Sequence, residues 1–368
     1  MEMTNEMKMQ LYENGAFLIF LEFPEGAEFG IDFMSWTVGP KFKGLKMIPP
    51  GLHFVYFSCQ SAPGAGDHAP RIGFFHNFHS GEILVRKWDK KMEDLLPEDS
   101  VGTEEIERLR ANLKALDSSL GPYPFETYKK WYSLAGHITT DLAHELSPEC
   151  GRISTQCELV TQEQLVGGAN SNRVDRQHPV RMRFTDAQGL PIMKVAPGSQ
   201  LRFHVIPLNR VPSGCQGSDV TKHSLDATNQ LRRFAQSAYP GSDKESTMRI
   251  LGELQFAFVV FLVGQVYAGF DQWKQLVHLL CSCVDALRTD TDLYMQLLMV
   301  LHFQLKECPR DFFVDIVTRD NFLTESLGNL FANLETTTGV DGALLEKARK
   351  FKLYLTRHFK WHFEAVNE

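Results

Sequence analysis

The chain has 368 residues, 43% of them hydrophobic and 23% charged, which is the composition of a globular protein large enough for two domains. Its formal net charge of -7 argues against direct nucleic-acid binding, because proteins that bind phosphate backbones expose an excess of basic residues. The seven cysteines are odd in number and include no CxxC pair, which is typical of a reducing compartment.

Membrane association is not expected either. The most apolar stretch, Phe256 to Gly264, is far shorter than a transmembrane helix, and the acidic N-terminus lacks the apolar core of a signal peptide. We therefore expect the protein to be cytosolic or nuclear.

The first part of the chain has the pattern of short β-strands. Phe17 to Phe23 ends at a Pro-Glu-Gly turn and predicts a strand. His53 to Phe57 is apolar on both faces, as in a strand buried between two layers. Ile72 to His79 and Glu82 to Trp88 flank a Ser-Gly pair, which predicts a hairpin. Together these segments predict an antiparallel sheet or sandwich.

Helical patterns interrupt the strands before the first domain ends. Apolar residues recur at helical spacing after Thr103, which is followed by two glutamates, and again from Phe125 to Leu146. A polar stretch over about 147–180 is expected to be a flexible loop. Leu201 to Ile206 is expected to be the last strand, so that the first domain covers residues 1–210.

The second part of the chain predicts an all-α domain over residues 218–368, after a linker at Pro207 to Gly217. Arg249 to Asp271 is apolar nearly all round and should be the central, buried helix. A helix around Leu293 to Leu305 should stop at a Cys-Pro pair, and a final helix should run from Asp341 to about His358. The predicted fold class is α+β: a β-rich, sandwich-like N-terminal domain with added helices, followed by an all-α bundle.

No sequence motif of a common enzyme class is present: there is no GxxxxGK[ST] loop, GxSxG elbow or HExxH pair. His76, His79 and Glu82 could suggest a metal site, but strand positions three apart face opposite sides, so a hairpin with polar side chains is expected. Helix capping and solvation explain a further acidic group: Asp311, Asp315 and Asp320. We expect no catalytic residue, no metal and no cofactor.

Basic residues cluster in two places. One cluster is Lys41, Lys43 and Lys46, and the other follows the predicted loop: Arg173, Arg176, His178, Arg181 and Arg183. Each is either a solvated face or a docking patch for an acidic protein surface or for RNA carried by a partner. The first cluster lies beside Trp36 and Phe42, which either fill the core or anchor a partner. We predict that Phe29 to Gly51 is a long surface loop whose partner-binding residues are Trp36, Lys41, Phe42, Lys43 and Lys46.

Several segments, taken in order, are similar to a known family: FGIDFMSWTVGPKFKGLKMIPPGLHF (Phe29 to Phe54), LGPYPFETYKKW (Leu120 to Trp131), LGELQFAFVVFLVGQVYAGFDQWKQL (Leu251 to Leu276) and DFFVDIVTRDNFLT (Asp311 to Thr324). With the ending KFKLYLTRHFKWHF, the chain resembles the Aar-two splicing-factor family over nearly its whole length. The combination of segments is specific, although no single motif is diagnostic.

This resemblance implies an assembly factor of the U-five small nuclear ribonucleoprotein (snRNP), with a β-rich domain followed by a helical, VHS-like domain. It implies binding to the RNase H-like and Jab/MPN domains of Prp-eight, which keeps the helicase Brr-two off the immature particle. Members of the family can carry a C-terminal tail that adds a strand between partner domains, whereas this chain stops at Glu368.

Two other interpretations remain open from the residues alone. The protein could be an unrelated scaffold or adaptor whose helical domain binds peptides or ubiquitin. It could also be an enzyme that uses the β-rich domain, in which case a metal or a deep pocket lined by His53 or His76 is expected.

Overall fold

The computed structural model describes residue 11 and residues 13–60, 68–155, 159–161, 193–308 and 322–363. Within these residues it has a β-rich unit, drawn from residues up to 123 and from 144 to 202, and a helical unit, drawn from residues 124–143 and from 203 onward. A β-sheet-rich region followed by an all-helical region confirms the predicted α+β fold class.

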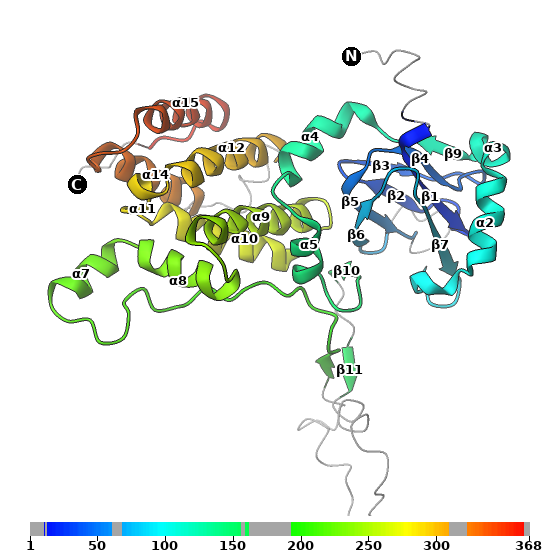
Figure 1. Ribbon diagram of the computed structural model, residues 1–368, viewed down its shortest axis with the longest axis horizontal. Helices are drawn as coiled ribbons and strands as arrows, with labels where there is room; N and C mark the ends of the chain where they lie inside the picture. The colour runs from blue at the N-terminus through cyan, green and yellow to red at the C-terminus, as the bar shows by residue number, and fades with distance from the viewer. Residues whose placement is uncertain are drawn as a thin grey trace, which may run out of the picture. The chain divides into compact units, whose positions relative to one another are not determined.

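The first sheet of the β-rich unit is five-stranded, in the order β8-β7-β1-β4-β9, and mixed in direction (Figure 1). Its central strand β1 pairs in parallel with β7 and antiparallel with β4, and β4 pairs in parallel with β9. The strand bounds are β1 (Ala16–Leu21), β4 (Gly44–Ile48), β7 (Ile83–Asp89), β8 (Asp94–Leu95) and β9 (Leu120–Pro122). The sequence predicted an antiparallel sheet or sandwich, and this sheet differs from the first alternative because two of its strand pairs are parallel.

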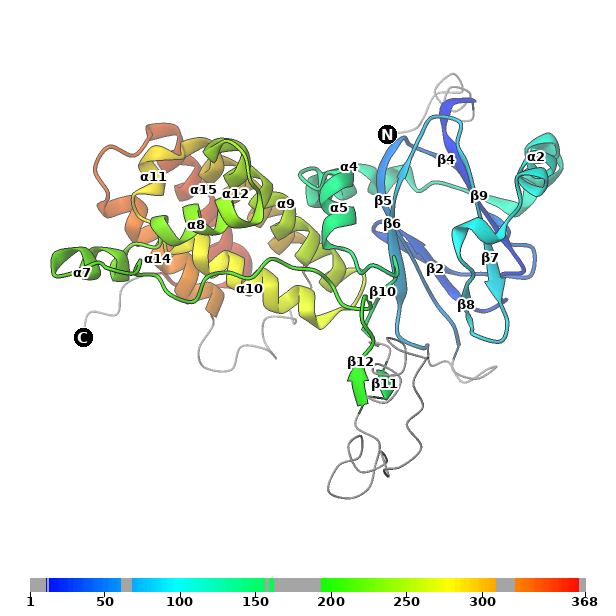
Figure 2. The ribbon, with the colours of Figure 1, turned by 60° about the horizontal axis from the view of Figure 1, so that its bottom comes forward.

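The second sheet is five-stranded and antiparallel, in the order β10-β6-β5-β2-β3 (Figure 2). Its strands are β2 (Glu28–Ile31), β3 (Met34–Thr37), β5 (Gly51–Ser58), β6 (Ile72–Phe78) and β10 (Ile153–Ser154). A separate two-stranded ladder joins β11 (Leu159–Thr161) to β12 (Met193–Val195). As predicted, β5 is buried on both faces from His53 onward.

The side chains of β1 alternate between two packing layers, as the two-residue period of a strand requires. Phe17 and Ile19 join the side chains of β7 in a cluster that α2 (Thr103–Ala111) and α3 (Leu113–Leu116) cover. Phe20 points to the opposite side, where its ring lies 5.3 Å from that of Phe29 in β2 of the second sheet. The unit is thus a sandwich of two sheets with helices on one outer face.

Two predictions about strands are wrong. β6 and β7 do not form a hairpin, because β6 pairs with β5 and β10 while β7 pairs with β1 and β8. The turn between them, at Gly81 with φ +67°, carries the chain from one sheet to the other. Leu201 to Ile206 is not a strand either: it is irregular, and from Phe203 onward it belongs to the helical unit.

The helical unit is built around α9 (Asp243–Leu262), in which Ile250 to Val260 are buried on every side. The other helices are α4 (Phe125–Ala135), α5 (Thr140–Leu146), α7 (Ser218–Leu225), α8 (Thr228–Ala238), α10 (Tyr267–Cys281), α11 (Ala286–Thr289), α12 (Thr291–Glu307), α14 (Phe322–Thr336) and α15 (Gly342–Phe359). The predicted helix from Arg249 to Asp271 is in fact two, separated by a short turn that includes Gln265 at φ +60°. At Gly269 in α10 a Cβ atom would lie 2.5 Å from the carbonyl oxygen of Ala257, so glycine lets α9 and α10 pack closely.

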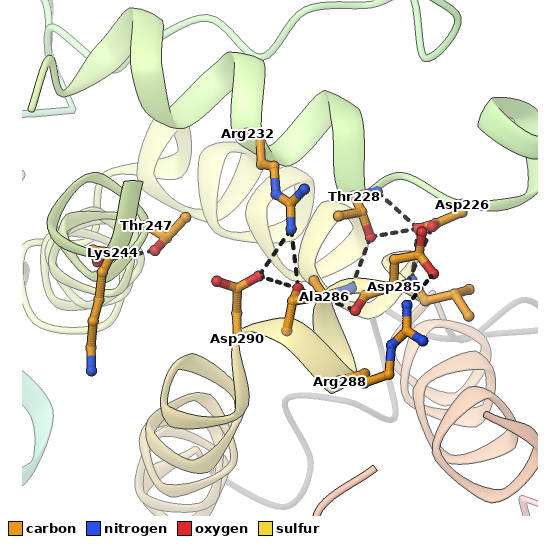
Figure 3. Close-up of polar contacts among 11 residues, drawn as sticks. Asp226, Thr228, Arg232, Lys244, Thr247, Asp285, Ala286, Arg288 and Asp290 are labelled. Carbon is orange, nitrogen blue, oxygen red and sulfur yellow. Dashed lines mark hydrogen bonds and ion pairs between the residues drawn. The ribbon is translucent and has the colours of Figure 1, made fainter. Parts of the chain in front are cut away.

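A polar clamp, formed by Asp226 and Thr228, joins the start of α8 to the chain between α10 and α11 (Figure 3). Oδ1 of Asp226 accepts hydrogen bonds from the hydroxyl and the backbone N–H of Thr228 and from the N–H of Val284. Its Oδ2 accepts from the N–H of Asp285, and the Thr228 hydroxyl accepts from the N–H of Ala286. These hydrogen bonds give acceptors to backbone N–H groups near helix ends that have no acceptor within a helix.

A buried carboxylate in α9 holds the irregular segment that begins at Phe203. Glu253 is fully buried, and it accepts hydrogen bonds from the N–H of His204, the amide of Gln272 and the hydroxyl of Tyr239. Nδ1 of His204 lies 3.1 Å from Oε2 of Glu253. A charge that is buried in this way is tolerated only because several donors surround it.

No helix in the described part of the chain is both long and apolar enough to span a lipid bilayer. Several sequence predictions fall outside the described residues: most of the loop over 147–180, the basic set from Arg173 to Arg183, and the acids Asp311, Asp315 and Asp320.

Candidate protein-docking face of the β-rich unit

The prediction that Phe29 to Gly51 is one long surface loop is wrong, because this range contains β3, β4 and parts of β2 and β5. Only residues 38–43 connect β3, at the edge of the second sheet, to β4 in the first sheet. This crossover, with Trp36 at its start, is what we call the docking loop. It carries Lys41, Phe42 and Lys43.

Hydrogen bonds at both ends fix the docking loop. Val38 exchanges two backbone hydrogen bonds with Gly26 and Ala27, each 2.9 Å long. At the other end the N–H of Lys43 donates to the carbonyl of Ser119, and its carbonyl accepts from the N–H of Phe20. Gly44 follows at φ +136°, where a Cβ atom would overlap the carbonyl oxygen of Leu18. A loop held in this way loses little conformational entropy when it binds a partner.

Phe42 anchors the docking loop in the aromatic core between the sheets. Its ring centroid lies 5.1 Å from that of Phe29, 6.0 Å from Phe23 and 6.4 Å from Phe20. The ring is half-buried, so its main role in the free protein is packing. Trp36 stacks on the outer side of Phe29 at 6.5 Å and is 37% exposed, so it offers an indole face to a partner.

The three predicted lysines have different surroundings. Lys41 and Lys43 are exposed, and neither ammonium group forms an ion pair with a described residue. Lys46 is half-buried in β4, where its Nζ lies 2.6 Å from Oδ1 of Asp117 and 3.1 Å from the Asp117 carbonyl. The structure therefore brings Trp36, Lys41 and Lys43 to the surface, while Phe42 and Lys46 support the unit from inside.

A buried polar network, which the sequence patterns did not reveal, joins Asp32, His53 and Tyr123. Oδ2 of Asp32 lies 2.7 Å from Nδ1 of His53 and accepts a 2.5 Å hydrogen bond from the Tyr123 hydroxyl. Nε2 of His53 lies 2.8 Å from the Pro49 carbonyl, so both ring nitrogens have a polar partner. The only available signal was a polar residue, His53, within an otherwise apolar strand.

These residues hold structure together and do not face a substrate. Asp32 is 0% exposed and His53 is 1% exposed, so neither lines an open pocket. The imidazoles of His76 and His79 both contact the Glu82 carboxylate, at 2.8 Å and 3.2 Å. Burial alone raises the pKa of Glu82, but the N–H of His79 and the imidazole of His76 outweigh it and hold that pKa below its usual value. Among the described residues, no group of three or more His, Cys, Asp or Glu side chains could hold a metal ion.

Comparison with known proteins gives the family. The AAR2 N-terminal domain matches residues 14–148, and the AAR2 C-terminal repeat region matches residues 203–364. A curated protein from Caenorhabditis elegans, named Protein AAR2 homolog, is 48% identical over 364 residues, which are 96% of each chain. The Homo sapiens protein of the same name is 39% identical, covering 100% of this chain and 95% of its own.

The chain belongs to the AAR2 family. This confirms the resemblance to the Aar-two splicing-factor family that the five quoted segments indicated. The N-terminal AAR2 match spans the docking loop and every residue predicted to bind a partner: Trp36, Lys41, Phe42, Lys43 and Lys46. The C-terminal match begins at residue 203, where the helical unit resumes after its first segment at residues 124–143.

Proposed function

We propose that this AAR2-family chain is a non-enzymatic pre-mRNA splicing factor that acts in U-five snRNP assembly. In this role it binds the RNase H-like and Jab/MPN domains of Prp-eight and blocks premature binding of the helicase Brr-two. The observation that carries the proposal is the AAR2 match in both halves of the chain. Action on Prp-eight before the particle matures fits a protein that is both cytoplasmic and nuclear.

The docking loop is the surface of the β-rich unit that best fits such a role. It presents an exposed indole and two ammonium groups that form no ion pair with a described residue, on a backbone fixed at both ends. Aromatic residues supply most of the binding energy in protein interfaces, and charges at the rim steer the encounter. The sealed surroundings of Asp32 and His53 favour a binding role over a catalytic one. The function needs neither a cofactor nor direct contact with nucleic acid.

Charge reversal on the docking loop tests this proposal. We expect Lys41→Glu combined with Lys43→Glu to weaken binding of the Prp-eight RNase H-like and Jab/MPN fragment by about tenfold or more, because two attractive rim charges become repulsive. The melting temperature should hardly change, since exposed lysines contribute little to folding. Binding is measured by isothermal titration calorimetry with the full chain.

The matched control is Lys91→Glu combined with Lys114→Glu, which makes the same charge change at exposed positions of the same unit. It should bind the Prp-eight fragment as the unchanged chain does. If both double variants bind normally, the docking loop is not the interface. If the unchanged chain itself fails to bind the fragment, the proposed function is wrong.

A further inference from the structure

The last helix of the helical unit, α15, has two stripes with different environments. Its buried stripe consists of Leu344, Ala348, Phe351 and Leu355. These side chains face α12 and α14, which lie beside α15 (Figure 1). A second stripe follows the helical spacing i, i+3, i+4, i+7 and i+8 and consists of Lys350, Leu353, Tyr354, Arg357 and His358. We call this second stripe the basic groove.

The basic groove is a shallow hollow of about 330 Å³ that these five side chains line. Leu353, in its middle, is 47% exposed, which is a large apolar surface for a helix whose other leucines are more deeply buried. The Tyr354 ring forms one wall, with the His302 ring of α12 at 4.4 Å and the His358 ring stacked at 5.3 Å. Because these rings support one another, this wall has a defined shape before any ligand binds.

Positive charge surrounds the exposed leucine. α15 contains five Lys or Arg residues and a single acidic residue, Glu346. Of the five, Lys350 and Arg357 line the groove, whereas Lys352 pairs with Glu335 of α14 at 2.9 Å. Lys350 meets Glu346 at 3.3 Å on the same helix, with both side chains largely exposed, so this contact is weak. Arg357 forms no ion pair with any residue that the structure describes. A guanidinium in this position can make a bidentate contact with a carboxylate.

We propose that the basic groove binds an acidic segment of a partner protein. An apolar side chain of that segment would cover Leu353, and its carboxylates would pair with Lys350 and Arg357. We infer an acidic partner because α15 is rich in basic residues. We infer that the partner also has an apolar side chain because Leu353 is exposed between Lys350 and Arg357. Single-stranded RNA fits less well, because His302 and His358 already occupy the Tyr354 ring on which a base would stack. The proposal does not depend on the docking loop or on Prp-eight.

Fluorescence anisotropy with the full chain tests this proposal. The probe is a fluorescein-labelled peptide of glutamates with two leucines one helical turn apart, and a second probe replaces both leucines with serine. We expect the first probe to bind and the serine probe to bind about tenfold more weakly. Arg357→Glu and Leu353→Ser should each weaken binding of the first probe by about tenfold, while binding should also fall as salt screens the charges.

The matched control is Lys129→Glu, which reverses an exposed lysine on α4 of the same unit and should leave binding unchanged. Circular dichroism confirms that each variant keeps its helical content, and two independent variants guard against a folding defect in one. The proposal is overturned if the first probe does not bind or if Leu353→Ser and Arg357→Glu bind it normally. It is equally overturned if a labelled RNA oligonucleotide binds more tightly than the peptide and loses that binding in Arg357→Glu.

Discussion

The polar clamp at Asp226 gives a quantitative test of how the helical unit is held together. Oδ1 of Asp226 accepts three hydrogen bonds, at 2.9, 2.6 and 2.8 Å, and Oδ2 accepts one at 3.2 Å (Figure 3). Asp226→Asn keeps one oxygen, which can take the place of Oδ1, but it removes the negative charge and turns an NH₂ group toward the N–H of Asp285, which then lacks an acceptor. A hydrogen bond to a charged group contributes about 1.5–3 kcal/mol, so we expect the substitution to lower the free energy of unfolding by about 2–3 kcal/mol.

The pH dependence of this effect has a definite sign. Burial alone raises the pKa of Asp226, but hydrogen bonds from Thr228, Val284 and Asp285 outweigh it and hold the pKa below its usual value. The unfolded chain, with an aspartate pKa of about 3.9, therefore binds the proton more tightly than the folded chain. The stabilisation is fully present above the unfolded pKa and is lost as the pH falls through the folded pKa. The stability gap between the unchanged chain and Asp226→Asn should thus narrow below about pH 4.

Urea unfolding followed by circular dichroism at 222 nm measures this gap at neutral pH and at successively lower pH. Asp292→Asn is the control, because Asp292 pairs with Lys244 at 2.7 Å where both side chains are exposed, and little change is expected. The reasoning fails if Asp226→Asn and Asp292→Asn shift the unfolding midpoint equally. It also fails if the gap for Asp226→Asn stays constant as the pH falls.

Three further predictions follow from other parts of the molecule. Tyr123→Phe removes one hydrogen-bond donor to Asp32 and should lower the free energy of unfolding by about 1–2 kcal/mol, as measured by urea unfolding. An unchanged unfolding midpoint would mean that this hydrogen bond does not stabilise the fold. A fragment of residues 203–368 should be helical by circular dichroism. It should unfold at a higher urea concentration than a fragment of residues 218–368, because only the longer fragment pairs Glu253 with His204. Equal unfolding midpoints would contradict this role of Glu253. The full chain should bind single-stranded or duplex RNA no better than about 10 μM at physiological salt, and submicromolar, steeply salt-dependent binding would refute this.

Local sequence signals predicted several helix ends and several strands. Asp341 caps α15 by accepting from the N–H groups of Ala343 and Leu344, which is the role that its position before an apolar periodic run suggests. α12 ends at Glu307, directly before the predicted Cys-Pro stop. Such signals work because capping and periodicity depend only on neighbouring residues.

The errors concern partners that are distant in sequence. Alternation shows that β6 and β7 are strands, but it cannot show that they belong to different sheets. Leu201, Phe203 and Val205 alternate like a strand, yet Phe203 packs on Phe256 and His204 binds Glu253 in α9. Glu253 is buried in the middle of α9, and no local pattern in the sequence shows that His204 covers it.

The candidate docking residues illustrate the same limit. The sequence placed aromatic residues and lysines together, and the structure divides them by burial: Phe42 and Lys46 have partners inside the unit, while Trp36, Lys41 and Lys43 face outward. The partner of Lys46, Asp117, lies 71 positions along the chain, beyond the reach of any local pattern. Burial could be assigned only after the two sheets and their connection were known.

The net charge of -7 is compatible with locally basic docking surfaces. The docking loop presents two lysines without ion pairs among the described residues, and α15 presents five basic residues against one acidic residue. Such small cationic areas attract an acidic protein segment at close range but release too few counterions to hold a nucleic-acid backbone tightly. Each surface also has an exposed apolar side chain, Trp36 in one and Leu353 in the other. Desolvation of that side chain would supply affinity that salt does not screen, so binding at either surface should be only partly lost at high ionic strength.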